Sequence, residues 1–290
     1  MNPADRDRFD YDWRKMAQPT HKTEPPAVAG GETETSGRIG VAVDGHIAVL
    51  TIDRPRKLNA MTRQMIDDFR SITAELDADP NVRAIVLTGA GERAFSAGGD
   101  LNTLLPPALD AADDLLNPVT TERFLSSVFT PVVAAVRGLC FGAGFEILLG
   151  TDIRVASTDA SFGLPEVKWG LIPGSGTHVR LPQQMSWPQA MQLLLTGVPV
   201  TASTAVSIGL INETVPPESV LDRAVEIAGA IALNGPLAVR TAKEIAVRSL
   251  NQHGAFALEH ALNSRVLGSE DAREGVAAFQ EKRNATFLGR

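Results

Sequence analysis

Cysteine is almost absent from this sequence: Cys140 is the only one in 290 residues. A single cysteine excludes an intrachain disulfide, which is consistent with a reducing compartment. Cys140 lies in an apolar segment before a turn, which favours a packed small side chain over a reactive nucleophile. No apolar run is long enough to cross a bilayer, and the charged opening MNPADRDRFDYDWRK lacks the apolar core of a signal peptide. We therefore expect a cytoplasmic protein without a membrane-spanning segment.

Basic residues are fewer than acidic ones, with 27 Lys and Arg against 34 Asp and Glu. The formal net charge of −7 and the pI near 5.3 disfavour a general nucleic-acid-binding protein, which would carry a basic face. The five histidines show no metal-ligand spacing, so we expect no metal site. For His178 we favour a role in structure or in supporting a site residue. Ser175 lacks the flanking glycines of a G-x-S-x-G nucleophile elbow, because Pro173 and Thr177 stand in their places. A serine hydrolase therefore has little support.

The sequence divides into three regions by composition and pattern. Residues 1–36 mix charges with proline, glycine and threonine, and they predict a flexible N-terminal extension. Residues 37–215 alternate between strand and helix patterns, which predicts an α/β core. Residues 216–290 contain helical patterns with apolar faces and no strand pattern, which predicts a helical C-terminal layer.

Local signals place the main elements of the core. Asp44-Gly45 between two apolar runs predicts a β-hairpin, and Thr62 is a candidate N-cap for the helix that follows it. Buried strands are expected at 81–88, 132–136 and 152–156. Further helices are expected at 120–128, 177–181 and 188–196, with an irregular segment at 104–119.

Residues 89–94, GAGERA, match the dinucleotide fingerprint G-x-G-x-x-A. That fingerprint requires a helix that begins at the glycines, whereas the small-residue turn Ala97–Asp100 follows almost at once. We therefore reject a dinucleotide site here.

The most informative stretch is 131–173, PVVAAVRGLCFGAGFEILLGTDIRVASTDASFGLPEVKWGLIP. A strand leads through a Gly-Ala-Gly turn into an apolar helix that carries Glu146, and Glu166 lies in a later loop. Small residues at a helix N-terminus leave backbone N–H groups open to a ligand oxygen, although they also allow close packing. Two carboxyl groups in one apolar pocket can divide acid and base work, but each is also explicable alone, Glu146 by the helix dipole and Glu166 as a solvated loop residue.

The segments AFSAGGDL, FGAGFEILLGTD and SFGLPEVKWGLIPGSG closely resemble the crotonase superfamily, the enoyl-CoA hydratases and isomerases. The resemblance covers about residues 39–287. It implies a spiral of ββα units with a helical C-terminal oligomerisation region that builds homotrimers, commonly paired into hexamers. It also implies an acyl-CoA thioester substrate and no further cofactor, since coenzyme A is part of the substrate.

The resemblance assigns roles residue by residue. Backbone N–H groups of Gly99 and Ala143 match the oxyanion hole that polarises the thioester carbonyl, and Glu146 and Glu166 match the hydratase acid–base pair, with Glu166 the partner of C2. Residues matching the CoA-binding positions are Lys57, Leu58, Ala60, Ala97, Asp100, Phe279 and Lys282, the last two in a stretch that resembles one reaching a neighbouring subunit's CoA. Residues expected to shape the acyl pocket are Leu104, Phe124, Phe141, Phe145 and Trp169.

The expected activity is reversible addition of water to the 2,3 double bond of a 2-enoyl-CoA. Both glutamates favour a hydratase, because many simple isomerases of the family keep only a match to Glu166. Alternatives within the family are an isomerase, dehydratase, decarboxylase or carbon–carbon hydrolase, and a scaffold that binds RNA or protein is a more distant one.

Overall fold

The computed structural model describes residues 37–101, 104, 123–250 and 252–290. The expected N-terminal extension and most of the expected irregular segment at 104–119 lie outside the described residues. Residues Thr33–Arg290 group into one compact unit, and the description that follows concerns this unit alone.

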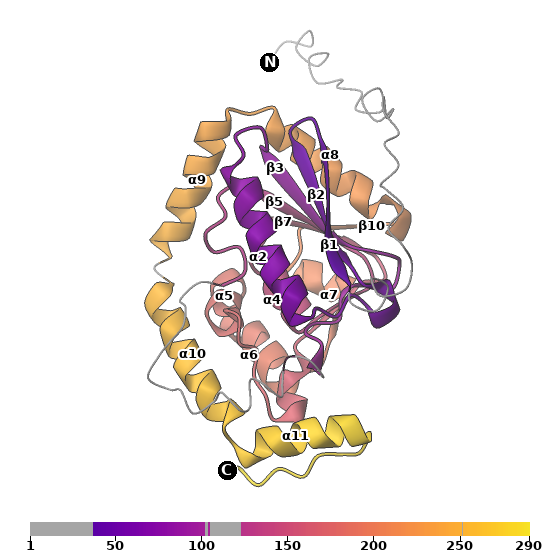
Figure 1. The fold of residues 1–290 in the computed structure, drawn as a ribbon, viewed down its shortest axis with the longest axis vertical. Helices are drawn as coiled ribbons and strands as arrows, with labels where there is room; N and C mark the ends of the chain where they lie inside the picture. Colours follow the sequence, from indigo (N-terminus) through magenta and orange to yellow (C-terminus); the bar gives the residue numbers. More distant parts are fainter. Residues whose placement is uncertain (1–36, 102–103, 105–122, 251) are drawn as a thin grey trace. The chain divides into compact units, whose positions relative to one another are not determined.

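The larger of two sheets has six strands in the order β1-β2-β3-β5-β7-β10 (Figure 1). Its strands are β1 (Arg38–Asp44), β2 (Ile47–Asp53), β3 (Ala84–Gly89), β5 (Val132–Val136), β7 (Ile153–Ser157) and β10 (Glu213–Val215). Strands β1 and β2 pair antiparallel with Asp44 opposite Ile47, so the hairpin expected at Asp44-Gly45 is confirmed. The other neighbouring strands pair in parallel. All five residues of β5 are buried, which is typical of a central parallel strand covered on both faces.

A smaller sheet has the order β4-β6-β8-β9. Its strands are β4 (Ala94–Ser96), β6 (Leu139–Phe141), β8 (Ser161–Gly163) and β9 (Val200–Thr201). Three successive chain segments each give one strand to the larger sheet and the next strand to the smaller one: β3 then β4, β5 then β6, and β7 then β8. This repetition is the spiral of paired strands expected from the sequence, and it stacks the turns after β4, β6 and β8 close together.

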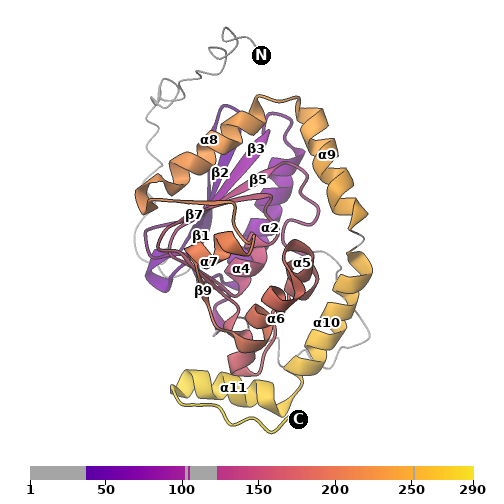
Figure 2. The ribbon, with the colours of Figure 1, turned by 180° about the vertical axis from the view of Figure 1, so that it is seen from behind.

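Alternation along the strands of the larger sheet produces two apolar layers. Ala84 and Val86 of β3 pack with the helix α8 (Val220–Ala232) on one face. Ile85 and Leu87 face the main core, which includes the apolar side of α2 (Arg63–Ala78). Side chains of a strand point alternately to opposite faces, so a run that is apolar at every position serves both layers. Figure 2 shows α8 on the face of the sheet away from α2.

The helices follow the patterns read from the sequence in most places. The Thr62 hydroxyl accepts the Met65 N–H at 3.2 Å, so its expected role as the N-cap of α2 is confirmed. The remaining helices of the core are α4 (Ala143–Leu148), α5 (Thr177–Gln184), α6 (Trp187–Thr196) and α7 (Ala202–Ser207), with short 3-10 turns η3 (Pro55–Lys57), η4 (Pro165–Trp169) and η5 (Pro217–Ser219). After α8 the chain forms α9 (Pro236–Ser249), α10 (His253–Leu267) and α11 (Glu270–Glu281).

Two local expectations have clear outcomes. The prediction of a helix at 120–128 is wrong for residues 123–128, the part that the structure describes. Leu125 adopts a left-handed φ of 62°, and the Ser126 hydroxyl accepts a hydrogen bond from the Arg123 N–H in a turn. The rejected dinucleotide fingerprint forms no helix. A Cβ on Gly89 would lie 2.3 Å from the carbonyl oxygen of Phe95, so close backbone packing explains this glycine.

Asn59 fixes the loop between β2 and α2. Its side chain is fully buried, accepts the Arg54 N–H at 2.9 Å and donates to the carbonyl oxygens of Ala90 at 2.9 Å and Ala94 at 2.7 Å. Its φ of 57° is a left-handed conformation that asparagine tolerates better than most residues. One side chain therefore joins this loop to the β3–β4 turn.

We expect Asn59→Ala to lower the free energy of unfolding by about 3 kcal/mol, since three buried hydrogen bonds are lost and alanine is strained at this φ. Urea unfolding at fixed protein concentration measures the loss. Asn234→Ala is the matched control, because Asn234 is exposed and makes one bond to its own helix, to Ala230. A loss below about 1 kcal/mol for Asn59→Ala would contradict the role assigned to this side chain.

Candidate active site

Two small-residue turns meet where the β4 and β6 strands end. Gly98 has a φ of 107°, and a Cβ there would lie 3.3 Å from the Ala143 nitrogen and 3.4 Å from the Gly142 Cα. A side chain at position 98 would push the two turns apart. Among the described residues, no atom accepts a hydrogen bond from the N–H of Gly99 or from the N–H of Ala143, the first residue of α4.

These turns border a cavity of about 320 Å³. Nine residues assigned to the site from the sequence line it: Lys57, Ala60, Ala97, Gly99, Asp100, Ala143, Glu166, Trp169 and Phe279. They come from the loop before α2, both small-residue turns, η4 and α11. The structure thus brings together, in one place, residues that lie more than 200 positions apart in sequence.

Glu166 stands at the cavity in the first turn of η4. Its Oε2 atom is buried and accepts no hydrogen bond, and a Cβ on Gly142 would lie 3.3 Å from its Oε1 atom. Burial raises the pKa of Glu166 to about 8, and the charge of Glu146 contributes in the same direction. At neutral pH this carboxyl group therefore holds its proton.

Glu146, on α4, is not among the residues that line the cavity, and it is 5% exposed. Its Oε1 atom accepts the Ser175 N–H at 2.6 Å and the Thr177 hydroxyl at 3.2 Å. Burial raises the pKa of Glu146 to about 6, the Ser175 N–H opposes this shift, and the charge of Glu259 adds to it. The two glutamates therefore differ at pH 7: Glu146 is mostly ionised, whereas Glu166 is mostly protonated.

Helix α11 supplies one wall of the cavity. The Phe279 ring packs edge-on against Trp169, with 4.9 Å between ring centroids. A Cβ on Gly275 would lie 1.9 Å from the Trp169 carbonyl oxygen, so only glycine lets α11 approach η4 this closely. Phe279 thus lines the cavity of its own chain, whereas the resemblance placed its segment at a neighbouring subunit's CoA.

The other expected CoA-binding residues fall in two groups. Lys57 is exposed at the cavity rim, and the Asp100 carboxylate accepts a bond from Arg54 at 2.8 Å. Leu58 does not line the cavity, but its carbonyl oxygen accepts the Ala97 N–H at 2.9 Å and joins the loop to the turn. Lys282 is exposed just after α11 and does not line the cavity.

The expected acyl-pocket residues also separate. Trp169 lines the cavity, and the Leu104 side chain reaches to 2.7 Å from a Cβ built on Gly99. Phe124 and Phe145 are core residues with exposures of 3% and 0%. Phe141 is half-buried in β6 and does not line the cavity.

Sequence reasoning missed Glu259, a buried carboxylate on α10. Its Oε1 atom lies 3.1 Å from Nδ1 of His178, and its Oε2 accepts Nε of Arg123 at 3.2 Å. The available signal was a glutamate inside the apolar run AFALEHAL, the same argument that singled out Glu146. His178, for which we expected a structural or supporting role, contacts this carboxylate.

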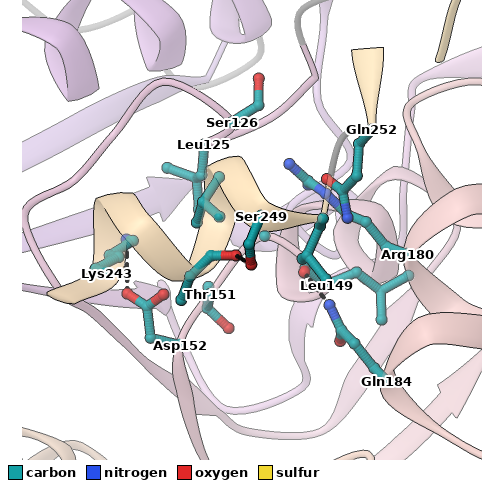
Figure 3. Close-up of a pocket in the computed structure, with 14 residues that line it drawn as sticks. Leu125, Ser126, Leu149, Thr151, Asp152, Arg180, Gln184, Lys243, Ser249 and Gln252 are labelled. Carbon is teal, nitrogen blue, oxygen red and sulfur yellow. Dashed lines mark hydrogen bonds and ion pairs between the residues drawn. The ribbon is translucent and has the colours of Figure 1, made fainter. Parts of the chain in front are cut away.

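A second cavity, of about 400 Å³, lies between α9, α5 and the segment after α4 (Figure 3). Its polar side chains are engaged by the fold: Lys243 pairs with Asp152 at 2.7 Å, and Gln184 donates to the Leu149 carbonyl at 2.9 Å. Buried Arg180 donates to a backbone carbonyl at 2.7 Å. Asp152 is the only carboxyl group among its described lining residues, so it offers no acid–base pair.

Within the described ranges, no group of three or more His, Cys, Asp and Glu side chains could hold a metal ion. No helix in the same part of the chain has the length and apolar character needed to cross a bilayer. Cys140 is fully buried, and burial raises the pKa of its thiol well above the usual value, so it is a packed side chain.

The two-sheet spiral with its C-terminal helices is the crotonase fold, and comparisons with known proteins agree. The family model described as enoyl-CoA hydratase/isomerase matches residues 43–290. The enoyl-CoA hydratase EchA19 of Mycobacterium tuberculosis is 40% identical over 254 residues, which are 85% of this chain and 94% of that protein. A carnitinyl-CoA hydratase from Mycobacterium avium has a solved structure with a TM-score of 0.76 and 35% identity, covering 89% of this chain and 100% of that one. The chain therefore belongs to the enoyl-CoA hydratase/isomerase family, and it is an enzyme of the hydratase type or of a related reaction in this family.

We expect Ala143→Pro to lower kcat by about 10² to 10³, because proline removes one N–H aimed at the cavity. Position 143 is the first of α4, where proline breaks no helical hydrogen bond. Ala143→Gly keeps the N–H and is the control, with a kcat within about threefold of wild type. Steady-state rates on crotonyl-CoA, with circular dichroism to verify folding, measure both, and a folded proline variant with normal kcat would remove this donor from the site.

Proposed function

We propose that the protein is an enoyl-CoA hydratase that adds water reversibly across the 2,3 double bond of a 2-enoyl-CoA. The observation that carries the proposal is the pair formed by buried Glu146 and half-buried Glu166, whose pKa values of about 6 and about 8 leave one ionised and one protonated at neutral pH. Hydration needs a base that removes a proton from water and an acid that donates a proton to carbon.

The proposed reaction assigns one task to each group. The thioester carbonyl oxygen accepts hydrogen bonds from the N–H groups of Gly99 and Ala143. These bonds stabilise the enolate as it forms. Ionised Glu146 takes a proton from water as the water oxygen bonds to C3. Protonated Glu166 then gives its proton to C2, and the enolate returns to the thioester. Proton exchange with solvent afterwards restores the ionised form of Glu146 and the protonated form of Glu166. The product carries one water more than the substrate, and the reverse sequence is dehydration.

The remaining features of the proposal concern binding and assembly. Lys57 at the cavity rim offers a positive charge to a CoA phosphate. No cofactor beyond the CoA of the substrate is proposed. The C-terminal region exposes large apolar side chains, which supports self-association; these are Leu233, Leu237, Ile245, Leu250, Leu258 and Leu262. The proposed assembly is a homotrimer or hexamer, and the proposed location is the cytoplasm.

The pH dependence follows from the two carboxyl groups. We expect kcat/KM for crotonyl-CoA hydration to rise through about pH 6, as Glu146 loses its proton and becomes a base. It should fall through about pH 8, as Glu166 loses the proton that it must donate. The two apparent pKa values belong to the coupled pair. Initial rates between pH 5 and 9 measure the profile, and a flat profile over this range would contradict the assignment.

Glu146→Gln and Glu166→Gln should each lower crotonyl-CoA hydration by at least about 10², because each change keeps the shape and removes a proton carrier. Glu75→Gln, an exposed position on α2, is the control and should keep the wild-type rate. Normal hydration by Glu146→Gln would exclude the hydratase mechanism. If wild type does not hydrate, but moves a 3-enoyl double bond using Glu166, the reaction is isomerisation.

A further inference from the structure

Glu259 is a buried charge to which the proposed reaction gives no task. It lies on α10 with 5% of the residue exposed. Its carboxylate accepts four hydrogen bonds: from the N–H of Gly176 at 2.7 Å, from the N–H of His178 at 3.1 Å, from Nδ1 of His178 at 3.1 Å and from Nε of Arg123 at 3.2 Å. A carboxylate this well satisfied is held in one position.

The segment it holds is the same one that holds Glu146. Alternate residues of 175–178 point to opposite carboxylates: Ser175 and Thr177 donate to Glu146, while Gly176 and His178 donate to Glu259. Gly176 has a φ of 98°, so the segment needs glycine at its centre. A shift of α10 would therefore move the two donors of Glu146.

The charges around this segment also connect the two carboxylates. Burial alone would raise the pKa of Glu259, but hydrogen bonds from His178 and Arg123 lower it below the usual value, so Glu259 is ionised at neutral pH. Its negative charge raises the pKa of Glu146, and the charge of His178 lowers it. The charged groups that influence Glu146 from the elements around it are Glu166 on η4, Glu259 on α10, and His178 and Arg180 on α5.

We propose that Glu259 is a positioning residue, which acts through the 175–178 segment to fix the orientation of the Glu146 carboxylate. The proposal rests on the proposed function, in which Glu146 is the base. It makes α10, a helix of the C-terminal region, a part of the acid–base apparatus although it does not line the cavity.

A purely structural alternative is that Glu259 only caps the N-terminus of α5 and pairs with Arg123. Both accounts predict some loss of stability when Glu259 is changed. Only the positioning account predicts a changed pH profile, so the profile distinguishes them.

The main test is Glu259→Gln, assayed for crotonyl-CoA hydration across pH 5 to 9. We expect kcat to fall about tenfold to a hundredfold with KM within about twofold, since Glu146 is displaced but the cavity wall is intact. The acidic limb should move to lower pH, because the negative charge that raises the pKa of Glu146 is gone. Glu244→Gln, at a partly exposed ion pair with Arg248 on α9, is the matched control and should leave kcat and profile unchanged.

A second variant covers the outcome in which Glu259→Gln does not fold. His178→Gln changes a side chain that is 31% exposed, and it removes the ring whose electrostatic interaction lowers the pKa of Glu146. Its acidic limb should move to higher pH, opposite to that of Glu259→Gln. If the wild type hydrates crotonyl-CoA and the acidic limb of the pH profile is unchanged in both folded variants, the positioning role is overturned.

Failure of the proposed function is distinguishable from failure of this inference. If wild type shows no hydration, the hydratase assignment falls, and the pKa of Glu146 is then followed by carbon-13 NMR in protein labelled at the glutamate carboxyl carbon. The Glu146 signal is identified by its loss in Glu146→Gln. A changed pKa of Glu146 in Glu259→Gln or His178→Gln supports the coupling without any assay, and an unchanged pKa in both overturns it.

Discussion

The close approach of two backbone turns is the constraint on which the site depends. Gly98 and Gly142 have almost no space for a side chain between them, so the turn after β4 and the turn after β6 touch through backbone atoms. The N–H groups of Gly99 and Ala143 therefore belong to one small region, although they come from different repeats of the spiral. Gly144 serves the same packing, because a Cβ there would lie 2.7 Å from the Ser96 carbonyl oxygen. The sequence allowed two roles for these small residues, close packing and open backbone N–H groups. Among the described residues, the structure shows both.

Burial raises the pKa of both glutamates, but their hydrogen bonds differ. The Glu146 carboxylate accepts two hydrogen bonds, which favour its ionised form and limit the rise in its pKa. Glu166 has a buried oxygen with no donor, and the negative charge of Glu146 disfavours a second charge near it. Two identical side chains in one apolar region can therefore supply a base and an acid at the same pH. The donors Ser175 and Thr177 lower the pKa of Glu146, and the charge of Glu146 raises the pKa of Glu166.

Local signals predicted much of the fold and several site residues. Three features depend only on residues that are close in sequence, so they can be predicted from it: the Asp44-Gly45 hairpin, the Thr62 cap and the apolar strand β5. The turn at 123–128 could not be predicted in this way, because its sequence also suits a helix. The turn forms through the left-handed Leu125 and the hydrogen bond from the Arg123 N–H to the Ser126 hydroxyl. Phe279 at its own chain's cavity and Glu259 beside the 175–178 segment depend on long-range packing of α11 and α10, which no local pattern specifies. The roles proposed for Gly99 and Ala143 came from the family resemblance, since a backbone donor cannot be recognised from residue type.

The C-terminal helices reach the site from two directions. Helix α11 meets η4 through Gly275 and also at Gly170, where a Cβ would lie 2.6 Å from the Asp271 carbonyl oxygen, so η4 and its Glu166 are held against a backbone surface. Helix α10 holds the segment that donates to Glu146. Each carboxyl group of the pair is therefore braced by a different C-terminal helix, and neither helix contributes a reacting group. The C-terminal region, which composition describes only as a helical layer, contacts the segments that hold the proposed acid–base pair. If the pair acts as proposed, changes that loosen α10 or α11 should alter the reaction through the positions of Glu146 and Glu166.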